Sequence, residues 1–592
     1  MHSLLTYPFD PQAILKKRKA IRRELLAADT PRIKKKIAVL GGSTTHDIIS
    51  ILELFLLDFG IEPEFYESGF GLYYEDAMFG SGLADFAPDL IYIHTSGRNV
   101  TGLPAPADTP EFVTELLEAQ YSRFEAMWEH LHETCRCPVI QNNFELPFFR
   151  ILGNRDGWDY RGRTNFITRL NARFAEYAAA HRDFYINDIN YLSADYGLLK
   201  WSDPFYWHMY KYCLNLDAIP ALSYNVACII KSLYGKNKKA LVLDLDNTLW
   251  GGIVGDDGPE GIEIGHETSM GQVYSEFQAY LKELRGYGIL LNVDSKNDEE
   301  NALAGLNHPE GTLRPEDLIC IKANWQPKDL NFTEIAEELN ILPESMVFVD
   351  DNPAERAIVT AQVPGVSAPV MDAPEHYIAA IDRCGFFEMT ELSKDDLSRS
   401  DMYMANAQRA RLQKSFASYE EYLLSLDMRA EIRPFGPVYI SRIAQLTNKS
   451  NQFNLTTRRY TESQLQELSG DESYVTLYGK LTDKFGDNGV ISVVMGHMDG
   501  DALDIMLWLM SCRVLKRNME HAMLDQLVRA AKKAGAAKLR GYYYKTAKNG
   551  MVKDLYKDFG FTLVSSEGED TVWELPIEGY RDKNTVIRVN CE

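Results

Sequence analysis

Short apolar runs alternate with amphipathic helical segments twice along this chain of 592 residues. The first series begins near Ile37, where KKIAVLGGST predicts a buried strand, HDIISILELFLLDFG a helix and PDLIYIHTS a second strand. The second series begins near residue 236 with the segments ALVLDLDNTLW, SEFQAYLKELRGYG and ILLNVDSKN. Continuous apolar strands separated by helices are typical of parallel sheets that are covered on both faces. The chain is therefore predicted to hold two α/β domains.

A third region has a different pattern. From near Arg429 the chain contains the strand-rich segments YVTLYGKL, GVISVVMGHM and ALDIMLWLMSCRV, followed by one long helical segment. Because a single hydrophobic core stops growing beyond about 250–300 residues, a chain of this length needs several domains. We predict α/β domains over residues 1–235 and 236–394, a polar helical connector over 395–427 and an α+β domain over 428–592.

Composition and charge exclude several classes of protein. Hydrophobic residues make up 45% of the chain and charged residues 25%, which is typical of a soluble folded protein. The 62 basic and 85 acidic residues give a net charge of −23, without the basic footprint of a nucleic-acid-binding protein. The start of the chain lacks the apolar core of a signal peptide, and the longest apolar stretches fall short of the ~20 residues of a membrane span. Eight mostly isolated cysteines indicate reduced thiols. We expect a cytoplasmic protein that binds neither nucleic acid nor membrane.

Polar side chains follow three strands of the second α/β series, at the point where each strand ends. These residues are Asp244 and Asp246, Ser295 and Asn297, and Asp350 and Asp351. Lys328, in the segment NWQPK, lies between the second and the third pair. Open α/β sheets bind their ligands at the carboxyl ends of the strands, and Mg²⁺ prefers oxygen ligands such as carboxylates. The pattern predicts a metal-assisted phosphoryl-transfer site.

These motifs, in this order over residues 240–356, resemble those of the haloacid dehalogenase (HAD) superfamily. The segments DLDNTLWGGIVGDDG, NWQPK and VFVDDNPAER are similar to its FkbH-like branch. The resemblance implies a Rossmann-like sheet in which Asp244 is the nucleophile that forms an aspartyl-phosphate. It implies that Asp246 protonates the leaving oxygen and later activates water.

The same resemblance implies the ligands of the metal and of the phosphoryl group. Ser295 and Lys328 would bind the phosphoryl oxygens and stabilise charge in the transition state. Thr248 and Asn297 are further candidates for substrate binding. The Mg²⁺ ligands would be Asp244, the backbone carbonyl of Asp246, and one of Asp350 or Asp351.

The segment between Asp246 and Ser295 is too short for a large cap domain. We therefore expect an open site beneath a flexible flap, WGGIVGDDG, whose glycines permit the turns. The FkbH-like family is associated with removing phosphate from 1,3-bisphosphoglycerate and loading the glyceryl group onto an acyl carrier protein as a thioester. Family members commonly have a cysteine in motif two where this chain has Asp294. A thioester at that position is excluded, which leaves direct transfer, another cysteine or a different substrate.

The C-terminal region resembles a GNAT-type acyltransferase, with strand MLWLMSCRV, helix KRNMEHAMLDQLVRAA and strand KLRGYYYK. In that fold, the loop before the helix binds the pyrophosphate of acyl-CoA. Here the loop has no glycine but carries Arg513, Lys516 and Arg517, which would suit the phosphate of a phosphopantetheine arm equally well. Cys512 lies beside Arg513, an electropositive setting of the kind that activates a thiol. Cys512 is a candidate thioester carrier; the alternative is a small buried hydrophobic residue.

The N-terminal region looks like a divergent SGNH-type hydrolase built on a flavodoxin-like sheet. Ser43 follows the first strand at the position of the nucleophile, and Gly97 and Asn143 would line the oxyanion hole. His208 would be the base, although its segment DPFYWH is longer than the usual D-x-x-H. Gly42 replaces the usual aspartate before the serine. A serine nucleophile needs an adjacent base, so an esterase and a non-catalytic binding module both remain open.

The leading hypothesis is a cytoplasmic, Mg²⁺-dependent multidomain enzyme. It would dephosphorylate a phosphoacyl substrate and transfer the acyl group to an acyl carrier protein. One alternative is a phosphatase of a small metabolite or sugar phosphate with non-catalytic flanking domains. Two others are an SGNH-type esterase and a scaffold whose sites are relics.

Overall fold

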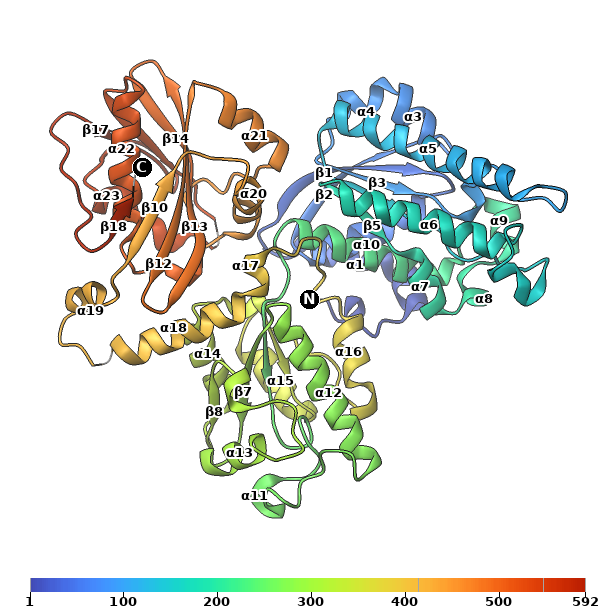
Figure 1. Cartoon of the computed structure of the whole chain (residues 1–592), viewed down its shortest axis with the longest axis horizontal. Helices are drawn as coiled ribbons and strands as arrows, with labels where there is room; N and C mark the ends of the chain where they lie inside the picture. The colour runs from blue at the N-terminus through green and yellow to red at the C-terminus, as the bar shows by residue number, and fades with distance from the viewer. Residues whose placement is uncertain (1, 414, 547, 591–592) are drawn as a thin grey trace. The chain divides into compact units, whose positions relative to one another are not determined.

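The computed structural model describes residues 2–413, 415–546 and 548–590. The chain divides into two compact units, Met1–Ser232 and Leu233–Glu592. Figure 1 colours the first unit blue to green and the second green to red. The first unit contains one parallel sheet, whereas the second contains a parallel sheet and a mixed sheet.

The sheet of the first unit has the strand order β2-β1-β3-β4-β5, and all its pairings are parallel. Its strands are β1 (Ile33–Gly41), β2 (Ile61–Glu67), β3 (Leu90–His94), β4 (Val139–Asn142) and β5 (Phe184–Asn187). Every residue of β3 is buried, and β1 is buried from Ile37 onward, as expected for strands covered on both faces. This order is that of flavodoxin-like sheets. The predicted parallel α/β sheet is confirmed, and the resemblance to SGNH hydrolases stays a prediction.

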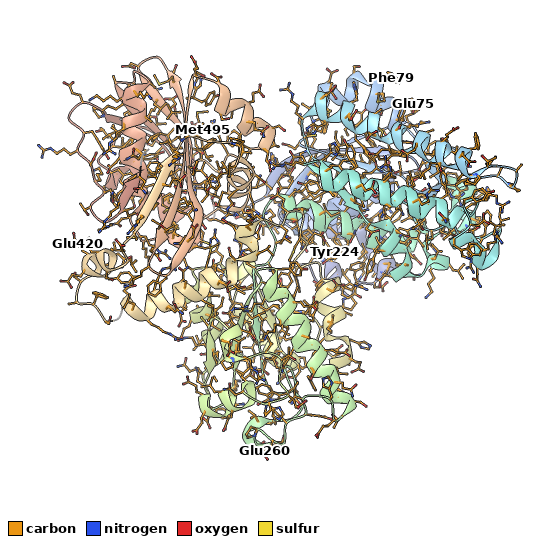
Figure 2. All side chains as sticks on the ribbon, viewed as in Figure 1. Glu75, Phe79, Tyr224, Glu260, Glu420 and Met495 are labelled. Atoms are coloured by element: carbon orange, nitrogen blue, oxygen red, sulfur yellow. The ribbon has the colours of Figure 1, made fainter. Side chains whose placement is uncertain are left out.

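Helices cover this sheet and supply most of its core. They are α1 (Pro11–Ala27), α2 (His46–Asp58), α3 (Tyr73–Phe79), α4 (Ser81–Phe86), α5 (Pro110–Cys135), α6 (Arg163–Ala180), α7 (Ile189–Tyr196), α8 (Leu198–Trp201), α9 (Pro204–Tyr210) and α10 (Ile219–Leu233). Tyr224 of α10, labelled in Figure 2, packs its ring 5.1 Å from that of Phe55 on α2. Within the described residues, the window Leu216–Leu233 is apolar and long enough for a membrane span, but 72% of it is buried. Core helices of folded domains have the same composition.

The parallel sheet of the second unit has the strand order β8-β7-β6-β9. Its strands are β6 (Ala240–Leu243), β7 (Leu290–Ser295), β8 (Ile321–Ala323) and β9 (Met346–Val349). The helices around it are α11 (Val254–Asp257), α12 (Ser269–Gly286), α13 (Glu299–Leu306), α14 (Lys328–Leu339), α15 (Pro353–Gln362) and α16 (Tyr377–Arg383). Between β6 and β7 the chain forms only the short α11 and the helix α12, where a cap domain would otherwise be inserted.

The mixed sheet occupies the last part of the chain and has the order β16-β17-β15-β14-β13-β12-β10-β18, with β11 beside β14. Its strands are β10 (Arg429–Arg433), β11 (Phe453–Asn454), β12 (Tyr474–Asp483), β13 (Gly486–Asp499), β14 (Ala502–Met510), β15 (Lys538–Tyr543), β16 (Thr562–Glu567), β17 (Asp570–Pro576) and β18 (Arg588–Asn590). The parallel pair β14–β15 is bonded over Ala502–Ile505, and the end of β14 pairs with β11 instead. This mixed topology is consistent with the predicted GNAT-like domain.

Helices pack on both faces of the mixed sheet. One face buries apolar residues of α22 (Met519–Lys533), which lies along the strands in Figure 1. The other face packs against α20 (Ile440–Lys449) and α21 (Glu462–Gly470). The short α23 (Leu555–Asp558) contributes Tyr556, which is fully buried.

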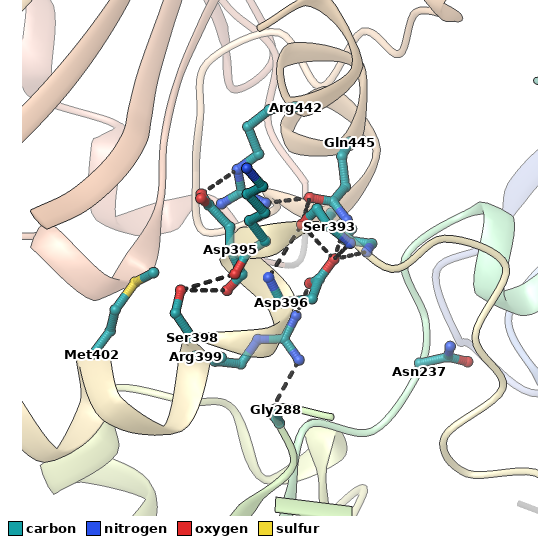
Figure 3. A network of polar contacts seen from close by, with 12 residues as sticks. Asn237, Gly288, Ser393, Asp395, Asp396, Ser398, Arg399, Met402, Arg442 and Gln445 are labelled. Carbon is teal, nitrogen blue, oxygen red and sulfur yellow. Dashed lines mark hydrogen bonds and ion pairs between the residues drawn. The ribbon is translucent and has the colours of Figure 1, made fainter. Parts of the chain in front are cut away.

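Between the two sheets of the second unit the chain forms α17 (Lys394–Leu397), α18 (Arg399–Gln413) and α19 (Tyr419–Ser425). A polar network holds the start of this segment in place (Figure 3). Asp396 accepts a hydrogen bond from Gln445 of α20 at 2.5 Å, and Asp395 lies 2.9 Å from Arg442 of the same helix. Arg399 donates to a backbone carbonyl between α12 and β7 at 3.2 Å. The predicted polar connector is thus bonded to the elements on both sides of it.

Candidate active site

Lys328 lies between two carboxylates at the carboxyl end of the parallel sheet in the second unit. Asp244 and Asp350 directly follow β6 and β9, which are neighbouring strands, and Lys328 is the first residue of α14. The Lys328 Nζ atom is 2.9 Å from Asp244 Oδ1 and 2.5 Å from Asp350 Oδ2. Burial alone would lower the pKa of Lys328, but the two carboxylates hold it above its ordinary value. The lysine therefore stays charged and neutralises part of the acidic cluster.

The acidic cluster contains more negative charge than Lys328 can balance. Asp244, Asp350 and Asp351 each have a carboxylate oxygen within 4.8 Å of the other two. Burial and the neighbouring Asp244 raise the pKa of Asp350 to about 6, and the same causes raise the pKa of Asp351. A divalent cation would relieve this repulsion, and an all-oxygen ligand set suits Mg²⁺. The residues present fit the predicted metal.

Asp246 lies two residues beyond Asp244, and three donors fix its carboxylate. Its Oδ1 atom accepts from the indole N–H of Trp250 at 2.9 Å and the backbone N–H of Val254 at 3.0 Å. Its Oδ2 atom accepts from the Asn297 amide at 3.0 Å. Burial raises the pKa of Asp246, which favours the protonated form that a general acid needs. Since Trp250 and Val254 belong to the glycine-rich flap, the flap is bonded to the residue predicted to transfer the proton.

Two other predicted residues, Ser295 and Thr248, are buried near the carboxyl ends of the same strands. Ser295 is the last residue of β7 and is 2% exposed. The fully buried Thr248 accepts from the backbone N–H of Asp351 at 3.2 Å. Arg356 of α15, which the sequence reasoning missed, donates to the carbonyls of Asp350 and Asp351 at 2.6 and 2.8 Å. Arg356 therefore braces the aspartate loop from behind; its position in VFVDDNPAER was the signal available for it.

Asp294 occupies the position at which family members commonly have cysteine. It is 0% exposed, and its Oδ1 atom accepts from the Asn331 amide at 3.1 Å. Its Oδ2 atom is buried without a hydrogen-bond partner among the residues that the structure describes. Burial raises the pKa of Asp294 to about 8, with Lys328 acting in the opposite direction. At neutral pH this side chain is a neutral carboxylic acid beside the site.

The candidate residues of the C-terminal region lie at the start of α22. Cys512 is half-buried, with its sulfur 3.7 Å from the Tyr403 hydroxyl of α18. Arg513 and Arg517 are buried, 3.6 Å from a carboxylate of α17 and 3.1 Å from a carboxylate of β12, respectively. Lys516 is exposed. The two arginines are thus engaged within the protein, and the roles of all four residues in substrate binding stay predictions.

In the first unit, the structure brings three of the four predicted SGNH-type residues to one end of the sheet. Ser43, Gly97 and Asn143 follow β1, β3 and β4, whereas His208 lies on the exposed surface of α9. His94, at the end of β3, contacts the same sulfur as Ser43, that of Cys213, and the sequence reasoning missed it. No local sequence pattern distinguishes it from a core residue.

Gly42, just before Ser43, has no room for a side chain. A Cβ atom at this position would lie 2.5 Å from the amide of Asn99. Asn99 donates to the Gly42 carbonyl at 2.9 Å and accepts from the Ser96 backbone N–H at 3.0 Å. The surrounding loop therefore favours glycine at residue 42.

The parallel sheet of the second unit, with paired aspartates at adjacent strand ends and a buried lysine between them, is of the HAD type. A crystal structure of the N-terminal part of BF1531 from Bacteroides fragilis, containing a phosphatase domain complexed with Mg, matches with a TM-score of 0.58 and 30% sequence identity. The match covers 64% of this chain and 99% of that chain. The chain belongs to the same family as this phosphatase-domain protein.

Two solved acetyltransferases match a smaller part of the chain. A GNAT-family acetyltransferase from Streptococcus pneumoniae is 14% identical, with a TM-score of 0.21 over 25% of this chain and 99% of its own. The PaiA N-acetyltransferase from Thermoplasma acidophilum, solved with coenzyme A, is 15% identical, with a TM-score of 0.19 over 25% and 98%. No protein-family model and no curated protein sequence matches the chain.

Proposed function

We propose that this chain is a Mg²⁺-dependent phosphatase of the HAD superfamily with Asp244 as its nucleophile. The observation that carries the proposal is the buried Lys328 between Asp244 and Asp350, with Asp246 held separately by the flap. The phosphatase domain and Mg of the solved relative support it. Asp244, Asp350 and Asp351 would hold the ion, which would neutralise charge on the phosphoryl oxygens when bound.

In the first step, a carboxylate oxygen of Asp244 attacks phosphorus, and the bond from phosphorus to the leaving oxygen breaks. Asp246 gives its proton to that oxygen, and its raised pKa favours the protonated starting state. Lys328 and Ser295 stabilise the negative charge on the remaining phosphoryl oxygens. Asp246, now ionised, takes a proton from water, which attacks the aspartyl-phosphate and releases inorganic phosphate.

The substrate that we propose is a phosphoacyl compound of the 1,3-bisphosphoglycerate type. Asp244 would hydrolyse its phosphate ester, while the thiol of an acyl carrier protein attacks the acyl carbon, displaces the acyl phosphate as inorganic phosphate and takes the acyl group. Two features support it: the short flap in place of a cap domain, which suits a large or presented substrate, and the resemblance of the motifs to the FkbH-like branch. Asp294 has no thiol and cannot carry a thioester, so the acyl group would pass directly to the carrier, or first to another thiol such as Cys512 that displaces the acyl phosphate. The alternative is a small metabolite or sugar phosphate.

Asp244→Asn tests the phosphatase. We expect loss of Mg²⁺-dependent phosphate release from p-nitrophenyl phosphate and acetyl phosphate, with an unchanged circular dichroism spectrum. Asp256→Asn, an exposed aspartate of the flap, is the matched control and should keep its activity. Turnover in Asp244→Asn would refute the nucleophile.

The acyl acceptor needs a separate experiment. Intact-mass spectrometry of a pantetheinylated carrier protein, incubated with the enzyme, Mg²⁺ and 1,3-bisphosphoglycerate, should detect the gain of one glyceryl group. The gain should disappear with Asp244→Asn. Phosphate release without any gain on the carrier would favour the small-molecule phosphatase.

A further inference from the structure

A cysteine, a histidine and a serine form a second buried cluster, in the first unit and apart from the HAD-type site. The Cys213 sulfur lies 3.3 Å from His94 Nε2 and 3.3 Å from Ser43 Oγ. The three residues are 4%, 2% and 2% exposed. Ser43 and His94 lie at the carboxyl ends of β1 and β3, the edge at which flavodoxin-like sheets bind their ligands.

The contacts around the His94 ring define which of its nitrogens points a proton at the sulfur. Asn142 Nδ2 is 3.1 Å from His94 Nδ1 and 3.0 Å from the Thr95 carbonyl, and its amide oxygen accepts from Asn187 at 2.7 Å, so its N–H groups point at the ring and the carbonyl. The Tyr92 hydroxyl also lies 3.1 Å from Nδ1 and can donate to it. Nδ1 therefore accepts, and in the neutral ring the proton is on Nε2, directed at Cys213. The Ser43 hydroxyl donates to the same sulfur. Two donors thus converge on one sulfur atom and would stabilise its thiolate form.

The segment before Cys213 is an exposed short helix that lies between two anchored residues. The next residue toward the N-terminus, Tyr212, donates to Asp47 at 2.6 Å, and the buried Trp201 fixes the other side. Between these anchors, α9 has no buried residue. It contacts the loops after β1 and β3. The Thr44 hydroxyl donates to the Tyr210 carbonyl at 2.7 Å and the Thr44 backbone N–H to the Lys211 carbonyl at 3.1 Å, and the Arg98 guanidinium lies 4.3 Å from the Trp207 ring centre. We define Pro204–Lys211 as the cap of this cluster.

Burial keeps the covered thiol unreactive. Burial and the charge of Glu145 raise the pKa of Cys213 to about 12, whereas hydrogen bonds from Ser43 and Ser96 lower it. Burial also lowers the pKa of His94 to about 4, which keeps the ring neutral. Movement of the cap would remove the desolvation penalty and leave the two donors in place, since Ser43 and His94 belong to the sheet and not to the cap.

We infer that the first unit carries an acyl-transfer site in which Cys213 is the nucleophile, His94 and Ser43 stabilise its sulfur, and Pro204–Lys211 caps it. The thiol proton passes to solvent when the cap moves. The thiolate then attacks the carbonyl carbon of an activated ester or thioester, the bond to the leaving alkoxide or thiolate breaks, and Cys213 becomes S-acylated. Solvent protonates the leaving group where its pKa requires it.

The test is acetylation of the full chain by p-nitrophenyl acetate, read as release of p-nitrophenol and as the acetylated peptide in mass spectrometry. We expect one acetyl group on Cys213, and a reaction faster than at Cys137, an equally buried cysteine at the opposite end of the sheet. His94→Leu should slow acetylation of Cys213 by about tenfold, because the sulfur loses one of the two donors that favour its ionisation. Asp244→Asn should leave the rate unchanged, which separates this site from the proposed phosphatase.

Two further variants test the nucleophile and the cap separately. Cys213→Ser retains the hydrogen bonds and should fold, without forming the hydroxylamine-sensitive thioester adduct. Thr44→Val loosens the cap by about one hydrogen bond and should accelerate acetylation by about fivefold. Acetylation of Cys213 no faster than that of Cys137, an unchanged rate in His94→Leu, or an adduct on Ser43 in place of Cys213 would each overturn the assignment.

Discussion

Replacing Lys328 by methionine tests the electrostatic centre of the proposed phosphatase site. The side chains of Lys328, Asp244 and Asp350 are only 4%, 10% and 0% exposed, so water screens the lysine poorly. Removing one partner of a buried ion pair costs about 3–5 kcal/mol. The methionine regains about 1 kcal/mol through its buried apolar end. The expected net loss is about 2–4 kcal/mol in the free energy of unfolding.

The assay is thermal unfolding in metal-free buffer together with phosphate release in Mg²⁺. We expect the unfolding midpoint of Lys328→Met to fall by about 4–8 °C and kcat by about 10²–10³. The loss of stability should depend on pH, because the pKa of Asp350 is already raised to about 6 and rises further without the lysine. The folded variant then retains a proton that the unfolded chain releases, so its deficit grows as the pH rises from about 5 to about 8.

Lys322→Met is the matched control, since Lys322 pairs with Glu334 and Glu338, which are about half-exposed. It should cost no more than about 1 kcal/mol. Equal stability of Lys328→Met and wild type at about pH 8, or a larger deficit at about pH 5, would refute the electrostatic reasoning.

Two further predictions concern buried positions outside the metal ligands. Since the pKa of Asp294 is raised to about 8, above its value in the unfolded chain, wild-type stability falls as the pH rises from about 4 toward 8. Asp294→Asn cannot ionise and should gain stability over wild type across that range in thermal unfolding; a difference that does not change with pH would contradict the assignment. Gly541→Ala places a Cβ atom 2.4 Å from the buried Tyr556 ring and should cost about 1–3 kcal/mol in the same assay. Gly436→Ala, with no atom within 4 Å of its Cβ, should leave the midpoint unchanged.

The sequence predicted the sheets and the HAD-type site because both are encoded locally. Asp244 and Asp350 follow apolar strands, and parallel strands bring their carboxyl ends to one edge. The structure confirms the parallel sheets and the mixed sheet, and it joins Lys328 to the two aspartates. Asn297 and Asp246 also follow neighbouring strands, β7 and β6, and the structure brings their side chains into contact.

No local sequence pattern predicted the cluster around Cys213. Cys213 and His94 are 119 residues apart, and each lies in an apolar segment in which a buried side chain is the ordinary expectation. For Arg513 and Arg517, a local pattern was present, but the ion pairs that these residues form in the fold were not predictable from it. Their position before a helix suggested a phosphate site, but a sequence does not disclose which carboxylates the fold brings to a cation.

The contact between Gly42 and Asn99 also limits which substitutions the first unit tolerates at these two positions. Introducing an aspartate at residue 42 first would clash with an amide held by two hydrogen bonds, whereas shortening Asn99 first would remove both of those bonds. Each single change is therefore unfavourable, and the two together partly compensate, which is strong epistasis between neighbouring residues. A substitution series that brings an aspartate to residue 42 must pass through a less stable intermediate, so this loop is expected to keep its glycine while more exposed parts of the unit vary.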